Sequence, residues 1–185
     1  MYNYKTEPFK HQRQALREGA KDYNFAYFME MGTGKTKVAI DNAAYLFQDK
    51  RIDFAFVIAP NSVYRNWLKE IKLHCPEDCN IYIWKVTKEK KFRLDPNKLT
   101  FILMNVEALS HKSGKKWLEE KLSKYGMRSI IIVDESTTIK NLKASRTKTI
   151  VKLGQLARFK RILTGSPVTK SPLDLFSQCA FLDKK

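Results

Sequence analysis

The residue types that bind the phosphates of a nucleoside triphosphate gather in one segment, Met29–Thr36. Its glycines let backbone N–H groups turn toward phosphate oxygens, and the N-terminus of the helix that follows adds partial positive charge. Lys35 can reach the β- and γ-phosphates, and the Thr36 hydroxyl can bind Mg²⁺. The strict pattern has Gly or Ala at the position of Met29, so an ordinary Gly-rich turn is the alternative. The residues expected to hold the nucleotide are Gly32, Thr33, Gly34, Lys35 and Thr36.

Two adjacent carboxylates, Asp134 and Glu135, follow the apolar run Ser129–Val133. A buried strand that ends in acids can hold both carboxylates rigidly at one edge of a sheet. We expect Asp134 to bind Mg²⁺, directly or through water, and Glu135 to orient and deprotonate an attacking water. Solvated acids at a strand end are the alternative, which the phosphate loop about 100 residues upstream makes less favoured.

Short and nearly continuous apolar runs indicate the elements that position these groups. Such runs are typical of strands that are buried on both faces, and helical spacing separates several of them. The sequence therefore predicts one α/β domain, with a mostly parallel central sheet and helices on both faces. Ligands of such sheets bind beyond the carboxyl ends of the strands. The predicted strands are Phe25–Phe28, Phe54–Ala59, Asn80–Trp84, Thr100–Met104, Ser129–Val133 and Arg161–Leu163.

The charge balance indicates a polyanionic partner. The 185 residues contain 35 Lys and Arg against 19 Asp and Glu, which gives a formal net charge of +16. Such a surface attracts nucleic acid and is screened by salt. A basic cluster at residues 85–93 predicts an exposed loop or hairpin. A second basic segment, which has no acid between Ser136 and Leu173, contains Lys140, Lys143, Arg146, Lys148, Lys152, Arg158, Lys160, Arg161 and Lys170.

The sequence contains no pattern that directs a protein to a membrane. No apolar run approaches the 18 or so residues of a membrane span, and the first residues do not form a signal peptide. Three cysteines are too few and too unevenly placed for a disulfide framework. We therefore expect a cytoplasmic protein without a membrane partner.

In the order and spacing of its motifs, the chain resembles the Swi/Snf-like branch of superfamily two helicases and translocases, including its small phage and bacterial versions. The first motif of that branch is similar to Glu30–Thr36, and the second to Asp134–Asn141. Ala59–Val63, followed by Trp67 and Glu70, is similar to the motif along one DNA strand. Leu163–Pro167 and the residues after it are similar to the third motif and its helix.

This resemblance implies roles that the residues alone leave open. It implies that Gln12 reads adenine, where a solvated helical glutamine is the alternative. It implies that Asn61 and Ser62 contact a backbone phosphate of DNA, and that Asn105 makes a second such contact, although helix capping by Asn105 is equally expected. Coupling between the γ-phosphate site and DNA would belong to Thr164, Gly165 and Ser166, where a Ser-Pro turn is the alternative.

The resemblance also implies what else a complete motor needs. Residues 1–185 would form a single RecA-like ATP-binding lobe, and a second RecA-like lobe, absent from this chain, would supply an arginine finger. Because that arginine contributes about 10³ to 10⁵ in rate, we expect the lobe alone to bind ATP and hydrolyse it poorly. Thr137 stands where the branch usually has His, and its hydroxyl does not titrate near neutral pH.

The function expected from these features is an ATP-binding lobe of an ATP-dependent helicase or translocase in a bacterial or phage-infected cell. Duplex DNA, held by its backbone without sequence reading, is the favoured nucleic acid. A nucleic-acid-binding module without hydrolysis is the main alternative, and a phosphate-loop kinase is a weaker one. We expect Trp67 to be packed in the core rather than stacked on bases, and zinc binding at His74–Cys79 is disfavoured because a fourth ligand is lacking.

Overall fold

The computed structural model describes residues 2–85, 95, 97–139, 141, 144–168 and 174–183. The strands are β1 (Asn24–Phe28), β2 (Phe54–Ala59), β3 (Cys79–Ile83), β4 (Leu99–Asn105), β5 (Ser129–Asp134) and β6 (Phe159–Thr164). The α-helices are α1 (Lys10–Gly19), α2 (Lys35–Gln48), α3 (Tyr64–His74), α4 (Lys112–Tyr125), α5 (Ser145–Gly154) and α6 (Asp174–Leu182). Short 3₁₀ turns are η2 (Val106–Ser110), η3 (Gly126–Arg128) and η4 (Ser136–Ile139).

All six strands lie in one sheet of order β1-β6-β5-β2-β4-β3, and every pair is parallel. The predicted strands are confirmed with small shifts. β3 begins and ends one residue earlier than predicted, since Cys79 pairs with Leu99, while Trp84 N still donates to Leu103 O at 2.9 Å. β6 begins two residues earlier, at Phe159, which pairs with Ile130.

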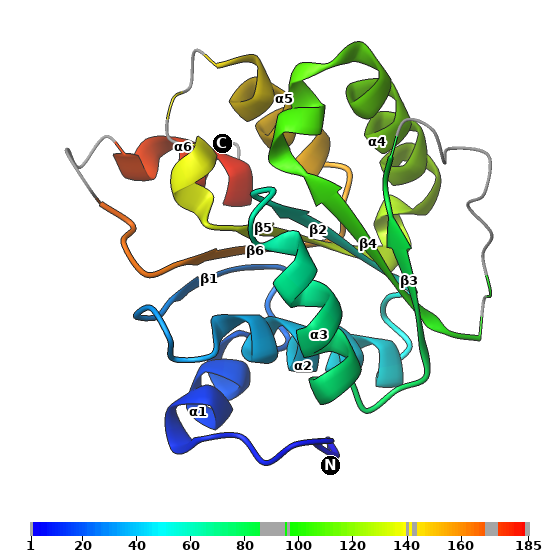
Figure 1. The fold of residues 1–185 in the computed structure, drawn as a ribbon, viewed down its shortest axis with the longest axis vertical. Helices are drawn as coiled ribbons and strands as arrows, with labels where there is room; N and C mark the ends of the chain where they lie inside the picture. Colours follow the sequence, from blue (N-terminus) through cyan, green and yellow to red (C-terminus); the bar gives the residue numbers. More distant parts are fainter. Residues whose placement is uncertain are drawn as a thin grey trace.

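Helices cover both faces of the sheet, as predicted. α1, α2 and α3 lie on one side, and α4, α5 and α6 lie on the other (Figure 1). Successive residues of β2 point alternately into two cores, Ala55 and Val57 into the first and Phe54 and Phe56 into the second. Because both faces are buried, the strands appear as continuous apolar runs in the sequence.

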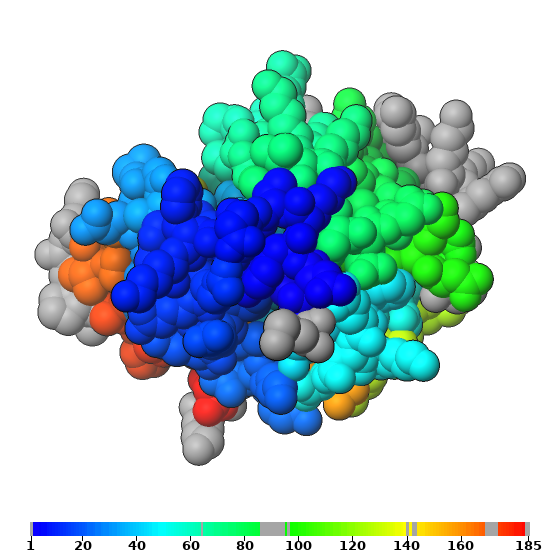
Figure 2. Space-filling view, turned by 90° about the horizontal axis from the view of Figure 1, so that it is seen from below, coloured from blue at the N-terminus to red at the C-terminus, as the bar shows by residue number. Residues whose placement is uncertain are grey.

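The N-terminal segment packs across the side that carries α1, α2 and α3. In the space-filling view its dark blue residues lie against the green of α3 (Figure 2). Lys5 Nζ donates to Lys72 O at 2.7 Å, and the Tyr2 hydroxyl donates to Asp41 Oδ1 at 2.9 Å. The segment thus connects α2 and α3 below the sheet.

Two cations of the basic segment at residues 136–173 are structural rather than available to a partner. Arg161 is fully buried, and its guanidinium donates to Asn42 Oδ1 and to backbone carbonyls that include Gly19 O and Asp22 O. Lys160 is also buried and donates to Gln155 Oε1 at 2.8 Å. These two side chains are therefore not available to contact a polyanion directly. Within the described residues, no helix has the length and apolarity to cross a bilayer.

Candidate nucleotide and nucleic-acid sites

The predicted phosphate loop joins β1 to α2 through two left-handed glycines. Met29 N still donates to Thr164 O of β6 at 3.2 Å, and the chain then leaves the sheet. Gly32 and Gly34 have φ values of +76° and +81°, which L-residues adopt only at a cost. Gly34 precedes α2 directly, and its carbonyl accepts from Val38 N at 3.2 Å. Backbone N–H groups at a helix start are the donors that phosphates require.

Lys35 opens α2, and its side chain turns back across the loop. Its ammonium is largely buried and donates to Met29 O and Glu30 O, each at 3.0 Å. An ammonium has three donors, so one proton remains for another acceptor. Two backbone carbonyls of the loop thus hold the ammonium in place, and its third N–H could donate to a phosphate bound in the same loop.

Asp134 and Glu135 lie where β5 ends, beside the loop, as the sequence predicted. Asp134 is buried, and its carboxylate accepts from the Trp67 indole Nε1 at 2.7 Å and from Glu135 N at 2.9 Å. Burial raises the pKa of the Asp134 carboxyl, although the two hydrogen bonds and the charge of Lys35 act in the opposite direction. The prediction that Trp67 is packed in the core is confirmed, because it is fully buried.

Glu135 has a left-handed backbone with a φ of +47°, which is strained for a residue with a Cβ. The strain redirects the chain just after the strand, and Thr138 N closes the turn on Glu135 O at 2.9 Å. Burial and, after it, the negative charge of Asp134 raise the pKa of the Glu135 carboxyl, which Lys35 partly opposes. A general base is most effective when its pKa lies near the operating pH, and the raised pKa brings the Glu135 carboxyl closer to that value.

These groups surround one cleft with a volume of about 320 Å³. Residues from the phosphate loop, the start of α2, the strand end at Asp134 and the first turns of α3 line it together. Its hydroxyl and carboxylate oxygens are the ligand types of Mg²⁺, and Lys35 supplies a cation for phosphate, so the residues present fit Mg²⁺ with a nucleotide. The place of Val63, Asn66 and Glu70 at this cleft was not predicted, because the resemblance assigned Val63 and Glu70 to the motif along a DNA strand. The lining residues are Met31, Gly32, Gly34, Lys35, Thr36, Val63, Asn66, Glu70, Asp134 and Glu135.

The Gln12 side chain supports the phosphate loop from α1. It is 5% exposed, its Nε2 donates to Thr33 O at 2.9 Å, and its Oε1 accepts from Phe9 N at 3.0 Å. The alternative of a solvated glutamine is therefore wrong. A Cβ on Gly34 would lie 2.3 Å from Gln12 Nε2, so alanine at this position would displace the end of the Gln12 side chain. Adenine recognition by Gln12 stays a prediction.

The segment Thr164–Ser166 lies against the phosphate loop, as the predicted coupling role requires. The buried Thr164 hydroxyl accepts from Ser166 N at 3.1 Å, and a Cβ on Gly165 would lie 3.1 Å from Met31 N. Ser166 is exposed.

Two hydrogen bonds of the buried Gln178 side chain, which were not predicted from the sequence, connect the loop after β5 to the loop after β6. Ser136 Oγ donates to Gln178 Oε1 at 2.6 Å, and Gln178 Nε2 donates to Pro167 O at 2.9 Å. Ser136 follows the strained Glu135, and Pro167 follows Ser166. A residue on α6 therefore ties the loop with the candidate base to the loop with the coupling segment.

Asn61 and Asn105 meet in a second cleft of about 320 Å³, beyond β2 and β4. Asn61 is exposed, and Asn105 Oδ1 accepts from Glu107 N at 2.9 Å, so the capping alternative for Asn105 is confirmed. Lys85 and His111 also line this cleft, whereas Ser62 is exposed in the loop beside Asn61 and does not line it. Most of the predicted basic loop, residues 86–94, lies outside the described residues.

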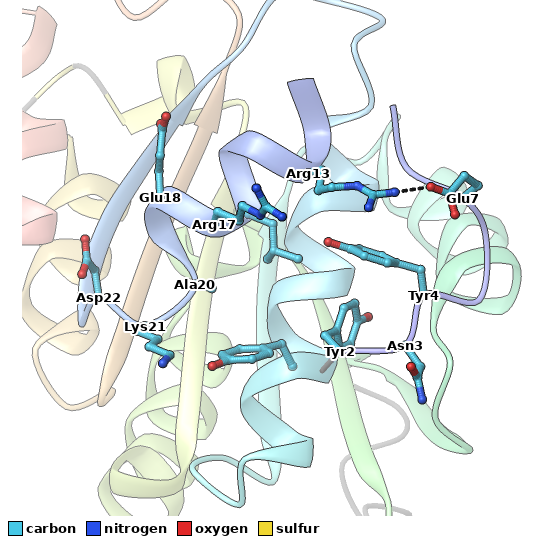
Figure 3. Close-up of a pocket in the computed structure, with 12 residues that line it drawn as sticks. Tyr2, Asn3, Tyr4, Glu7, Arg13, Arg17, Glu18, Ala20, Lys21 and Asp22 are labelled. Atoms are coloured by element: carbon cyan, nitrogen blue, oxygen red, sulfur yellow. Dashed lines mark hydrogen bonds and ion pairs between the residues drawn. The ribbon is translucent and has the colours of Figure 1, made fainter. Parts of the chain in front are cut away.

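A third cavity lies away from both clefts. It has a volume of about 800 Å³ and lies between the N-terminal segment and α1 (Figure 3). Tyr2 and Tyr4 line it from one side and Arg13 and Arg17 from the other, with Arg13 paired to Glu7. Its position away from the carboxyl edge of the sheet separates it from the predicted chemistry.

His74, the ligand considered for zinc, instead contacts Thr6 Oγ1 and Glu70 Oε2 through its two ring nitrogens.

The fold is an α/β domain with a parallel sheet, and the first cleft brings together the residues that the sequence predicted for phosphate and Mg²⁺. The SNF2-related domain family matches residues 23–185, and the chain belongs to this family. A SWI/SNF-related, matrix-associated, actin-dependent regulator of chromatin of Mus musculus, of subfamily A containing DEAD/H box 1, is 29% identical over 159 residues. A probable ATP-dependent DNA helicase of Arabidopsis thaliana is 31% identical over 168 residues. These alignments cover 83% and 87% of this chain but only 15% of each relative.

A solved structure confirms the predicted fold. The SWI2/SNF2 ATPase core of Sulfolobus solfataricus, in complex with double-stranded DNA, matches 98% of this chain with a TM-score of 0.81 at 22% identity. The chain spans 37% of that core. The phage or bacterial origin and the cytoplasmic location stay predictions.

Proposed function

We propose that this chain is the ATP-binding lobe of an ATP-dependent DNA helicase or translocase, which couples Mg-ATP hydrolysis to movement on DNA. The observation that carries this proposal is the first cleft. It joins Lys35 and Thr36, at the start of α2, to Asp134, the last residue of β5, and to Glu135, which follows it. Membership of the SNF2-related domain family supports the same activity.

The residues of the cleft divide the chemistry between them. Thr36 and Asp134 would hold Mg²⁺, which when bound neutralises charge on the phosphates. Lys35 would bind the β- and γ-phosphates together with the backbone N–H groups of residues 32–36. Glu135 would orient a water molecule and accept its proton as that water attacks the γ-phosphate. A second RecA-like lobe would supply the arginine finger, so this lobe alone would turn ATP over slowly.

The second cleft would hold the backbone of duplex DNA. Asn61 and Asn105 would contact phosphates through their amide groups, and Ser62 would do so through its hydroxyl from the exposed loop beside the cleft. The net positive charge would add a salt-dependent attraction without sequence reading. Thr164, Gly165 and Ser166 would couple the two sites, because they pack against the phosphate loop.

The test is ATP turnover and Mg-ATP binding by this chain, with and without duplex DNA. We expect Mg-ATP binding that is lost in Lys35→Ala, and slow turnover that Glu135→Gln abolishes. Absence of nucleotide binding by the wild-type chain would refute the ATPase assignment. DNA binding that neither ATP nor Lys35→Ala changes would favour a nucleic-acid-binding module, and rapid DNA-stimulated turnover would refute the need for a second lobe.

A further inference from the structure

Among the described residues, the Trp67 indole is the only side chain that donates a hydrogen bond to the Asp134 carboxylate. Nε1 donates to Oδ2 at 2.7 Å, and Trp67 is fully buried in the core between the sheet and α2. Packing alone would accept another aromatic ring at this position. The indole N–H adds a donor that needs an acceptor when it is buried, and here that acceptor is a carboxylate of the nucleotide cleft.

Both oxygens of Asp134 are held by donors from different elements. Oδ2 accepts from Trp67 on α3, and Oδ1 accepts from Glu135 N at 2.9 Å. Rotation about the terminal bond of an aspartate side chain is normally broad. Two donors at fixed places restrict this rotation and leave the second lone pair of each oxygen for another partner.

The helix that carries Trp67 borders both clefts. Asn61, three residues before α3, lines the second cleft, whereas Val63, Asn66 and Glu70 line the nucleotide cleft. Trp67 lies one turn into α3 and connects this helix to the end of β5. A displacement of the segment at Asn61 would therefore reach the Asp134 carboxylate through one hydrogen bond.

We propose that Trp67 is a positioning residue: its indole N–H holds the Asp134 carboxylate in the orientation that binds Mg²⁺, and makes that orientation depend on α3. This inference rests on the proposed function, since it assigns a support to the metal ligand of that site. Residues that orient metal ligands typically contribute about 10- to 100-fold to metal affinity. Trp67 thus connects the nucleotide cleft to the helix that begins at the second cleft.

The test compares nucleotide binding in Mg²⁺ and in EDTA. Trp67→Phe keeps an aromatic ring in the core and removes the N–H, and Trp117→Phe is the matched control. Trp117 is buried in the other core, where it stacks on Tyr82. We expect Trp67→Phe to lose about 10-fold in affinity for the Mg²⁺-nucleotide while its affinity in EDTA stays at the wild-type value. Trp117→Phe should match the wild type in both conditions.

An equal loss with and without Mg²⁺, or no loss, would overturn the positioning role while wild-type binding still supported the proposed function. If the wild type showed no binding that depends on Mg²⁺, the proposed function would fail and this inference with it.

A second measurement observes the hydrogen bond without changing Trp67. In ¹⁵N-labelled protein the indole N–H resonance of Trp67 is assigned as the one that disappears in Trp67→Phe. We expect Asp134→Ala to shift this resonance and to leave that of Trp117 in place. Mg²⁺ added with nucleotide should also shift it in the wild type. A Trp67 resonance that ignores Asp134→Ala would overturn the proposal.

Discussion

The carboxyl edge of the sheet consists of two halves that meet between β5 and β2. In the half formed by β1, β6 and β5, the functional groups are charged and buried, as Lys35 and Asp134 show at 8% and 5% exposure. In the half formed by β2, β4 and β3, Asn61 is exposed and Asn105 is half-buried, and both carry neutral amides. The first half thus has the character that the proposed reaction needs, and the second has that of the proposed DNA-binding surface.

This difference follows from what each ligand requires. Transition-state stabilisation needs charges that are fixed in advance in a site with little water. The strained φ of +47° at Glu135 and the raised pKa of Asp134 are costs of that arrangement. A nucleic-acid backbone instead repeats the same phosphate, so several weak and exposed contacts suffice.

The largest predicted effect comes from one substitution that should weaken nucleotide binding and leave DNA binding unchanged. Lys35→Ala removes the buried ammonium, and we expect nucleotide affinity to fall by roughly 100-fold, about 3 kcal/mol, because charge-assisted hydrogen bonds to phosphate are lost. DNA affinity should not change. Isothermal titration with Mg-ATP and fluorescence anisotropy with labelled duplex measure the two affinities.

Lys124→Ala is the control for charge. Lys124 is exposed in the last turn of α4, and its loss removes one positive charge without touching either cleft. If Lys35→Ala weakened DNA binding far more than Lys124→Ala does, the two halves would not be separable in this way.

The next effect concerns the second cleft. Asn61→Ala and Asn105→Ala should each weaken DNA binding by about 3- to 10-fold, since each removes one neutral hydrogen-bonding group. They should leave the salt dependence of binding unchanged. Lys85→Ala should reduce the slope of log K against log salt by about 1, because it removes one phosphate neutralisation.

Asn105 needs a control for its cap. Its side chain accepts from Glu107 N, so Asn105→Ala should also destabilise the fold by about 1 kcal/mol. Asn105→Asp keeps that acceptor and adds a negative charge. This variant should therefore keep the stability and still bind DNA more weakly, and full DNA affinity in Asn105→Asp would exclude a phosphate contact there.

The sequence predicted the half formed by β1, β6 and β5 in more detail than the half formed by β2, β4 and β3. The spacing of Gly32, Gly34 and Lys35 fits only a few local structures. A parallel sheet places the carboxyl ends of its strands at one edge, so this loop and Asp134 come together although they are far apart in the sequence. The strands themselves were predictable because burial on both faces leaves continuous apolar runs. Strand ends shifted by one or two residues, because register partners such as Cys79 and Leu99 are not visible in a single sequence.

Long-range side-chain contacts were not predictable. The bond from Trp67 to Asp134 joins residues 67 positions apart, and that from Ser136 to Gln178 joins residues 42 positions apart. Tryptophan on an amphipathic helix indicates only a core position, and the direction of its N–H depends on how α3 packs. Likewise, nothing in the basic segment showed that Arg161 is buried, because its partners, the Asn42 side chain and several backbone carbonyls, are far from it in sequence.

An effect on stability rather than on binding distinguishes the two glycines of the phosphate loop. Both have positive φ, so alanine costs about 1 to 2 kcal/mol at either position. A Cβ on Gly32 meets nothing within 4 Å, whereas one on Gly34 would displace Gln12. Gly34→Ala should therefore lower the free energy of unfolding by about 1 to 3 kcal/mol more than Gly32→Ala, because a buried hydrogen bond is also lost. Urea unfolding measures the difference.

Gln12→Ala completes a double-mutant cycle with Gly34→Ala. With the Gln12 side chain absent, the added Cβ has no close partner, and the cost of Gly34→Ala should fall to that of Gly32→Ala. Additive costs would show that Gln12 moves aside without loss, and would weaken the view that it supports the loop.

The smallest predicted effect is a pH dependence of stability at Glu135. Because burial and the charge of Asp134 raise the pKa of Glu135 in the folded state, the native protein binds this proton more tightly than the unfolded chain does. The wild type therefore loses stability as the pH rises from the unfolded pKa through the raised folded pKa. Glu135→Gln does not titrate, so we expect it to be more stable than the wild type near neutral pH, with a difference that shrinks in acid. Urea unfolding of both proteins across this range measures the difference, and Glu107→Gln, an exposed acid outside the nucleotide cleft, is the control. If the difference in the free energy of unfolding between the two proteins were the same at every pH, the pKa of Glu135 would not be raised by folding. The contrast between the two halves would then rest on Lys35 and Asp134 alone.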